Sequence, residues 1–328
     1  MSQKTARCGE MGIGIESVAG IEADPTRAIP YVSVPDINDM QEQVQEDSAR
    51  GRRETPIQAV TVKKWAEGPL ETDLDVENSV YFLALMLGSV SSATDSNGTG
   101  SAYRHTITPQ QTIDPKTATF VYDRGQDKRQ FTYAVVESID LTVDEGLAKL
   151  SMAVKGKSST ASTKTIPADE EETLFAFKDY TAKFGSDISD AEGNSATNLK
   201  TLTLHLEQPV EIRFRSGSDE PVKITVGDLI GNGNFEVDFD SDTFRDYFLD
   251  GTTRAMVVKF TGDTIDGTAT EEITIKLGQI RFKGAPITSG GLGEVYMVAC
   301  EFDCEYENAT DNMLVQIEVV NLQDGSDY

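Results

Sequence analysis

The stretches EGPLETDLDVE at Glu67–Glu77 and NGNFEVDFDSD at Asn232–Asp242 decide the fold of this chain. They align at an offset of 165 residues, about half the chain, with one glycine, two apolar positions and four acidic positions in common. Both lead into a segment that predicts a helix, Val76–Leu87 in the first half and Thr243–Leu249 in the second. A strand, an acidic pattern and a helix that occur twice in the same order predict that one fold is duplicated along the chain.

The acidic residues of both stretches stand two positions apart. They are Glu71, Asp73, Asp75 and Glu77 in the first stretch, and Glu236, Asp238, Asp240 and Asp242 in the second. Because successive side chains of a strand point to opposite faces, each stretch predicts a strand with a row of carboxylates on one face. Such a face is either ordinary solvated surface or a surface whose charge has a function. Like charges at this spacing repel and cost stability, so their occurrence in both halves favours the second interpretation.

The composition limits the possible partners. The chain has 55 acidic and 29 basic residues and a formal net charge of −26. A basic surface is the usual mark of a nucleic-acid binder. This charge therefore argues against tight binding of DNA, although DNA could still move past such a surface. The most apolar stretch, Val80–Val90, is shorter than the ~20 residues of a membrane helix. The opening residues MSQKTARCGEM lack the apolar segment of a secretion signal. We therefore expect no membrane partner and synthesis in a cytoplasm.

Strand signals dominate, so we expect a mainly β protein. At roughly 100–200 residues per domain, the length predicts about two domains. We expect a first β module at 1–157, a polar linker at 158–197 and a second β module at 198–328, each module with a short flanking helix. The sequences IDLTV and AKLSMAV around Asp144–Leu147 predict a hairpin.

A long polar segment, 34–58, interrupts the first module and contains the basic cluster Arg50, Arg52 and Arg53. Loops beyond about 12–15 residues are usually functional or disordered. The segment is therefore either a flexible loop or an arm that reaches a neighbouring copy. We favour the arm, and we expect Gln41 and the three arginines to be its contact residues. The second half shows no obvious equivalent of this segment.

Motifs for catalysis and for metal or cofactor binding are missing from the sequence. The chain has two histidines, His105 and His205, and both stand in alternating strand patterns. No G-x-S-x-G, C-x-x-C, H-E-x-x-H or phosphate-loop pattern occurs. We expect no enzyme, no metal site and no cofactor.

At this point the sequence resembles the tail tube proteins of siphophages, also called major tail proteins. The resemblance runs through the segments GIGIESVAGIEADPTRAIPYVSV (Gly12–Val34), GPLETDLDVENSVYFLALMLGSV (Gly68–Val90), AYRHTITP (Ala102–Pro109), FTYAVVESIDLTVDEGLAKLSMAVKGK (Phe131–Lys157), LKTLTLHLEQPV (Leu199–Val210), GNFEVDFDSDTFRDYFLDGT (Gly233–Thr252) and QIEVVNL (Gln316–Leu322). The resemblance covers most of the chain outside the central linker. The evidence for it is the order in which these segments follow one another, since no single motif is diagnostic.

The resemblance implies a β-sandwich or partly closed barrel with a flanking helix, and rings stacked into a tube through which DNA passes. Typical members carry one fold per chain and form homohexamers, so a duplicated chain predicts a pseudo-hexameric homotrimer. The eight acidic residues would then line the lumen and repel DNA, and the arm would contact the next ring. Implied partners are the tape measure, terminator and distal tail proteins, with transient contact to viral DNA, in a virion with a non-contractile tail.

Two alternatives remain open from the sequence. Another tail-ring protein of the same fold, such as a terminator or baseplate-ring subunit, would form one ring without stacking. A carbohydrate-binding or adhesin β-sandwich should show exposed aromatic platforms or a secretion signal, and the sequence shows neither.

Overall fold

The computed structural model describes residues 6–46, 48, 51, 58–170, 172–289, 291, 295–326 and 328, and these residues are mainly β, as predicted. The first part of the chain contains η1 (Ala6–Cys8), β1 (Glu10–Ile15), β2 (Arg27–Ala28), β3 (Asn38–Gln45), β4 (Ala59–Asp73), α1 (Ser79–Leu87), β5 (Gly88–Thr94), β6 (Tyr103–Pro109), β7 (Ala118–Asp123), β8 (Lys128–Val143), β9 (Lys149–Gly156) and β10 (Thr160–Ala161). The second part contains η2 (Phe177–Asp179), β11 (Tyr180–Gly185), α2 (Ile188–Gly193), β12 (Leu199–Glu207), β13 (Val210–Arg213), β14 (Lys223–Val226), β15 (Ile230–Asp238), α3 (Thr243–Leu249), β16 (Thr253–Asp266), β17 (Ala269–Gly284), β18 (Ile287–Thr288), β19 (Met297–Glu305) and β20 (Val315–Asn321).

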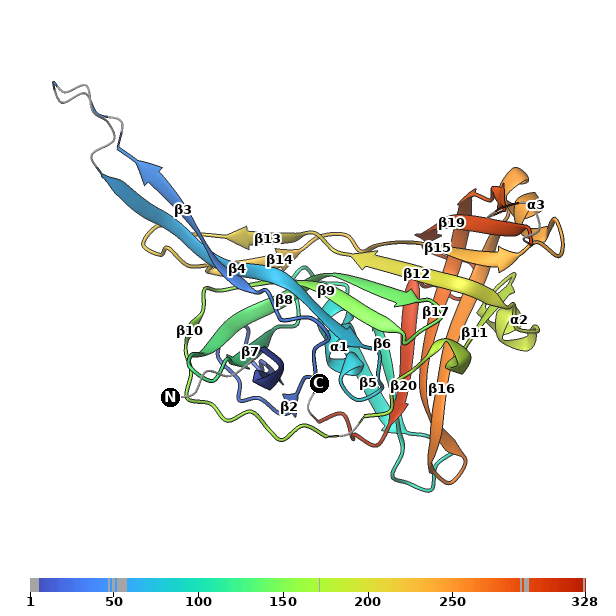
Figure 1. Cartoon of the computed structure of the whole chain (residues 1–328), viewed down its shortest axis with the longest axis horizontal. Coiled ribbons are helices and arrows are strands. Elements are labelled where there is room, and N and C mark those ends of the chain that lie inside the picture. The colour runs from blue at the N-terminus through green and yellow to red at the C-terminus, as the bar shows by residue number, and fades with distance from the viewer. Residues whose placement is uncertain are drawn as a thin grey trace.

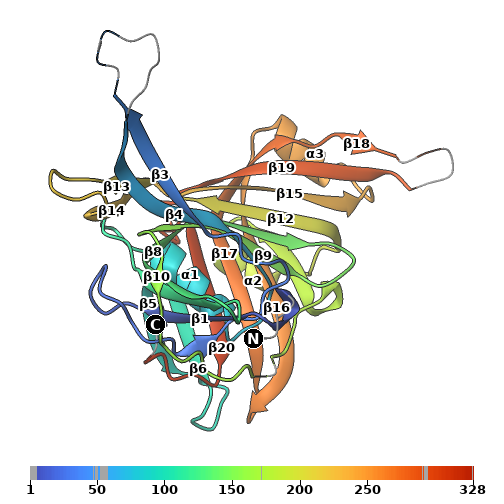
Figure 2. The same ribbon diagram turned by 60° about the vertical axis from the view of Figure 1, so that its left-hand side comes forward.

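One antiparallel sheet runs through both parts of the chain, and we call it the long sheet. Its strands pair in the order β3, β4, β9, β8, β12, β15, β19 and β17. Figures 1 and 2 show the strands from β3 to β19 crossing the upper part of the molecule, with α1 beneath them, whereas β17 runs downward beside β16. The predicted hairpin around Asp144–Leu147 is confirmed as β8 and β9, which lie at the middle of this sheet.

A second layer covers the apolar face of the long sheet. The first part of β8 leaves the long sheet and pairs with β7, which pairs with β1. The first part of β17 likewise leaves the long sheet and pairs with β16, which pairs with β11. Helix α1 packs within this sandwich, and all nine of its residues are buried. It ends at Gly88, whose positive φ of 88° favours glycine.

The second part of the chain repeats the strand pairing of the first part. The pairs β1–β7, β3–β4, β4–β9, β7–β8 and β8–β9 correspond to β11–β16, β12–β15, β15–β19, β16–β17 and β17–β19. The irregularities correspond as well. The register of β8 against β9 shifts between Val136 and Ser138, and that of β17 against β19 shifts between Phe282 and Gly284. The two parts therefore agree residue by residue, beyond the two stretches that the sequence aligns.

The aligned glycines, Gly68 and Gly233, occupy equivalent places in this pairing. A Cβ on Gly68 would overlap the carbonyl oxygen of Asp36, on the segment before β3. A Cβ on Gly233 would overlap the carbonyl oxygen of Thr203, on β12. Both positions therefore require glycine because a neighbouring backbone passes too close for any side chain.

One part of the predicted organisation differs from the structure. The range 158–197, expected as a linker, contains β10, η2, β11 and α2, and β11 pairs with β16 along its whole length. Both predicted flanking helices are present, but α1 is fully buried whereas no residue of α3 is buried. Polar composition at 158–173 suggested a linker, but the short apolar run that follows is part of a sheet.

The second part also has an equivalent of the polar segment 34–58, contrary to the expectation that it has none. In the first part β3 and β4 extend beyond the sandwich as a hairpin (Figure 1). In the second part the hairpin of β13 and β14 continues β12 and β15 in the same way. The pair Gln43–Thr61 corresponds to the pair Val210–Val226. We call β3 with the described N-terminal part of β4 the first arm, and β13 with β14 the second arm.

Candidate functional site

The long sheet has one polar face, opposite the face that packs on α1. Directly paired residues of neighbouring strands share a face of a sheet. One row of such pairs crosses seven strands, through Glu71, Ser151, Asp140, His205, Asn232, Asp303 and Arg281. The residues next to this row in each strand, such as Leu141 and Leu204, are buried. The polar face is therefore continuous from the first part of the chain to the second.

Four of the eight predicted acidic residues lie on this polar face. Glu71 and Asp73 are at the end of β4, and both are partly exposed. Glu236 and Asp238 are at the end of β15, where Glu236 is partly exposed and Asp238 is exposed. Strand alternation therefore correctly predicted that these four side chains lie on one face of their strands.

Further acidic residues of the polar face were missed from the sequence. They are Asp140, Glu207, Glu301, Asp303 and Glu305. The alternation of Glu301, Asp303 and Glu305 along β19 is a usable signal, of the same kind as the alternation in the two aligned stretches.

Basic residues offset part of this negative charge. Lys149 Nζ lies 3.4 Å from Glu71 Oε1, and Lys283 Nζ lies 2.6 Å from Asp303 Oδ2. Arg281 Nε lies 2.5 Å from Glu305 Oε1. The polar face is therefore acidic with interspersed cations.

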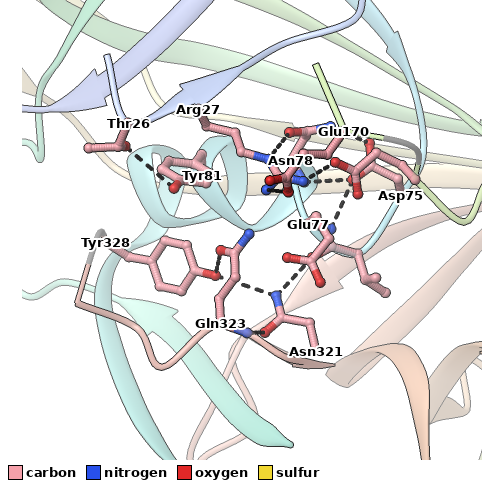
Figure 3. Close-up of polar contacts among 12 residues, drawn as sticks. Thr26, Arg27, Asp75, Glu77, Asn78, Tyr81, Glu170, Asn321, Gln323 and Tyr328 are labelled. Atoms are coloured by element: carbon pink, nitrogen blue, oxygen red, sulfur yellow. Dashed lines mark hydrogen bonds and ion pairs between the residues drawn. The ribbon is translucent and has the colours of Figure 1, made fainter. Parts of the chain in front are cut away.

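Asp75 and Glu77 do not continue the acidic row, because β4 ends at Asp73 and the chain turns toward α1 (Figure 3). Asp75 is 1% exposed. Its Oδ1 accepts hydrogen bonds from the backbone N–H groups of Glu77, at 2.9 Å, and Asn78, at 2.5 Å. A short acidic side chain commonly closes a turn in this way. The expected strand of four alternating carboxylates thus stops after two, and Asp75 instead fixes the connection from strand to helix.

Arg27 is the cation of a partly buried acidic cluster beside this turn. Its guanidinium forms ion pairs with Glu170 Oε2 at 2.7 Å and with Glu172, and its Nε donates to Asn78 Oδ1 at 3.1 Å. Burial raises the pKa of Glu77 to about 7, and the positive charge of Arg27 opposes this rise. Burial likewise raises the pKa of Glu172 to about 7 against the same opposing charge. This cluster holds Glu170 and Glu172, both within the expected linker, against the first part of the chain.

Asp240 and Asp242 also lie outside their strand. β15 ends at Asp238, and the backbone N–H of Asp240 donates to the carbonyl of Asp238 at 2.9 Å. Asp242 is exposed, and its Oδ1 lies 3.6 Å from Arg245 Nη1 on the first turn of α3. Both carboxylates remain at the surface, near the end of the polar face but not within its rows.

The second arm lies against the base of the first arm. The backbone N–H of Lys64 donates to the carbonyl of Asp219 at 2.7 Å, and Lys64 Nζ lies 2.6 Å from Asp219 Oδ2. The rings of Trp65 and Phe214 meet edge to face at 6.5 Å. On the other side of the second arm, the N–H of Ile224 donates to the hydroxyl of Tyr133 at 3.1 Å. The second arm is therefore fixed to the body of the molecule.

The first arm projects without such support. All eight residues of β3 are exposed, including Gln41. Val44 and Val60, which pair across the arm, are both 53% exposed. An isolated two-stranded hairpin is at best marginally stable in water, so this arm requires a partner surface. Arg50, Arg52 and Arg53, predicted as contacts at its tip, lie outside the described residues.

Groups that could hold a metal ion and helices that could span a membrane are both absent from the part of the chain that the structure describes. No group of three or more His, Cys, Asp or Glu side chains is placed to hold a metal ion. No helix in the described part of the chain is long and apolar enough to cross a membrane.

A two-layer β protein with open strand edges, one continuous polar face and a projecting hairpin has the features of a subunit that assembles through its sheets. The comparisons define this class further. A family model described as phage tail tube protein matches residues 9–304. The chain therefore belongs to the phage tail tube protein family and is a structural component of a virion tail. No curated protein matches the chain.

Proposed function

We propose that three copies of this chain form each ring of a tail tube, and that the rings stack into a channel through which viral DNA passes during ejection. The observation that carries this proposal is the pairing of β8 with β12, through which the sheet of the first part continues into the second with its polar face uninterrupted. Each part then acts as one tail tube module, and the repeated pairing favours a boundary shortly before β11.

The strand count supports a ring of this size. The long sheet contributes eight strands per chain, and three chains therefore give 24. At ~4.8 Å between strands and a tilt of ~40°, a closed barrel of 24 strands has a circumference of about 150 Å and a backbone diameter of about 50 Å. Closure also removes the open strand edges, which otherwise promote uncontrolled pairing.

The polar face is our candidate for the lumen wall, with Glu71, Asp73, Glu236 and Asp238 among its acidic residues. An excess of carboxylates repels the phosphate backbone, so DNA contacts such a wall only transiently and without sequence preference. Asp75 is excluded from this wall because it is buried within the chain. Three further predicted acids lie beyond the ends of β4 and β15 and so outside the alternating row of each strand. They are Glu77, Asp240 and Asp242.

The first arm is our candidate for the contact between rings. Head-to-tail stacking is a heterologous contact that does not close, so it produces a filament. The exposed valines of the arm give it an apolar surface to bury, and the basic cluster Arg50, Arg52 and Arg53 would complement an acidic neighbour. The second arm is held by its own chain, so the two arms of one chain have different roles.

Electron microscopy of the purified protein tests the proposal. We expect hollow tubes whose cross-section shows three chains with sixfold appearance, and a map in which the polar face lines the bore. Single rings that never stack would instead indicate a terminator or baseplate-ring subunit of the same fold. Particles that remain monomeric under all conditions would refute a tube function.

Two variants test the arm separately. Deletion of Gln41–Arg53 should leave soluble subunits that form no tubes. Val44→Glu should weaken tube formation in the same direction, because it places a charge in the surface that the arm would bury. Val18→Glu is the matched control, since Val18 is equally exposed but lies outside the arm. Normal tubes from the deletion would refute the role of the arm.

The tube would meet further components of a long, non-contractile siphovirus tail. We propose the tape measure protein inside the bore and the terminator and distal tail proteins at the two ends as partners. The subunit would be made in the host cytoplasm before it enters the particle.

A further inference from the structure

The pairing of β8 with β12 joins the two halves of the long sheet, and its geometry can be compared with the free strand edges of the same chain. Ser138–Val143 pairs antiparallel with Leu202–Glu207, and Leu141 lies opposite Leu204. Both leucines are 3% exposed. The strand edge of one half is thus covered by the strand edge of the other.

Each of these two edges has a counterpart elsewhere in the chain. Leu141 pairs with Leu150 of β9, as Ile287 of β18 pairs with Val298 of β19. The edge of β8 therefore corresponds to Gly284–Thr288.

The counterpart of the β12 edge follows from the pairing of β4 and β15. His205 pairs with Asn232 as Asn38 pairs with Glu67. The edge of β12 therefore corresponds to the beginning of β3 and the residues just before it, Asp36–Met40. In this correspondence Ile37 takes the place of Leu204.

In the described part of the chain these two counterpart edges have no strand beside them. Ile287 is 38% exposed, whereas its counterpart Leu141 is 3% exposed with β12 alongside. The N–H of Ala299 donates to the carbonyl of Pro286 at 3.1 Å, so the backbone groups of Ile287 point to the opposite side, away from β19. The absent N–H of Pro286 would likewise face β19, so proline does not obstruct the outer edge.

The backbone of the other edge has the matching orientation. The N–H of Asp36 donates to the carbonyl of Pro69 at 3.4 Å, so Asp36 faces β4 and the backbone groups of Ile37 point outward. Ile37 is itself buried, as is its counterpart Leu204.

We propose that Gly284–Thr288 of one copy pairs antiparallel with Asp36–Met40 of the next copy, with Ile287 opposite Ile37. The partner of each open edge is thus a second copy of the same chain, and the register is that of β8 against β12. This inference rests on the proposed ring and specifies the strands that close it. It places Thr288 opposite Asp36, as a pair whose backbone groups point away from each other.

Engineered cysteines test this register. A non-hydrogen-bonded antiparallel pair has Cα atoms about 4.5 Å apart, which suits a disulfide. We would combine Thr288→Cys with Asp36→Cys in a Cys8→Ser background, because Cys8 is exposed and could be oxidised in place of the engineered pair. The matched control combines Thr288→Cys with Asn38→Cys, which on the same face shifts the register by two residues and separates the Cα atoms by about 8 Å, beyond disulfide reach. The single variants control for the two remaining native cysteines.

The readout is a non-reducing gel of assembled tubes after mild oxidation with diamide, together with electron microscopy of the same samples. We expect the first combination to yield covalent dimers and trimers, with trimer as the largest product, and the control to yield at least tenfold less. Tubes that form without cross-links at this pair, or with more cross-links in the control, would overturn the register while the proposed function stands. A protein that forms no rings at all would overturn both.

Discussion

Replacement of Glu77 by glutamine should stabilise the protein at alkaline pH and have almost no effect in acid. Glu77 lies at the turn between β4 and α1, where burial raises its pKa from the ordinary 4.5 to about 7. The folded protein therefore keeps a proton that the unfolded chain releases. Stability from this group is fully present below pH 4.5 and is lost as the pH rises toward 7. Glutamine carries no charge at any pH and removes this loss.

The size of the effect follows from the two pKa values. The interval from 4.5 to about 7, at roughly 1.4 kcal/mol per pKa unit, corresponds to about 3 kcal/mol. The pKa of Glu172 is also raised to about 7, and both carboxyl groups lie near Arg27, so the cluster titrates as a coupled set. The difference in unfolding free energy between variant and wild type should be near zero at pH 4 and about 3 kcal/mol at pH 8.5.

Urea unfolding of unassembled subunits, followed by circular dichroism at several pH values, measures this difference. Glu301→Gln is the matched control, since it makes the same chemical change at an exposed position of the polar face. Its difference from wild type should vary little with pH. A Glu77→Gln variant whose difference from wild type is the same at pH 4 and pH 8.5 would refute the assignment of a buried, proton-holding carboxyl at this turn.

Two further predictions concern the strand contacts. Gly233→Ala should destabilise the protein by more than about 2 kcal/mol or prevent folding, because the new Cβ would overlap the carbonyl oxygen of Thr203. Gly193→Ala is the control, since Gly193 has open space around it, and it should change the free energy of unfolding little in the same urea assay. Tyr133→Phe should lower the stability of the second arm by about 1–3 kcal/mol, because it leaves the buried N–H of Ile224 without its acceptor. The measurement is hydrogen exchange at the Ile224 amide, which should become faster. Unchanged exchange there would show that the hydroxyl does not fix the arm.

Local patterns predicted individual elements well. The helix Thr243–Leu249 and the hairpin at the centre of the long sheet follow from apolar periodicity and turn residues, and both are present. The acidic alternation predicted Asp73 and Asp238 on one face but failed two residues later. Asp75 continues the spacing of the pattern, yet its carboxylate binds backbone N–H groups, and an alternating sequence does not distinguish a strand from a turn closed by an acidic side chain.

The repeat was harder to follow because its elements are not separated by a constant distance. Leu70 of β4 corresponds to Phe235, 165 residues later, whereas Met152 of β9 corresponds to Cys300, 148 residues later. Loops of different length change the offset from strand to strand, so an alignment at one offset detects one pair of strands. For the same reason the equivalence of the second arm to the first arm becomes visible only through residue pairing.

The pairing of β8 with β12 within one chain has a kinetic consequence for assembly. A ring of six separate modules requires five successful collisions, whereas three chains that each carry two modules require two. In the proposed ring of three chains, every second joint would be completed while a chain folds, at an effective concentration that does not depend on the amount of protein made. Half of that ring would therefore be protected from register errors before any two molecules meet.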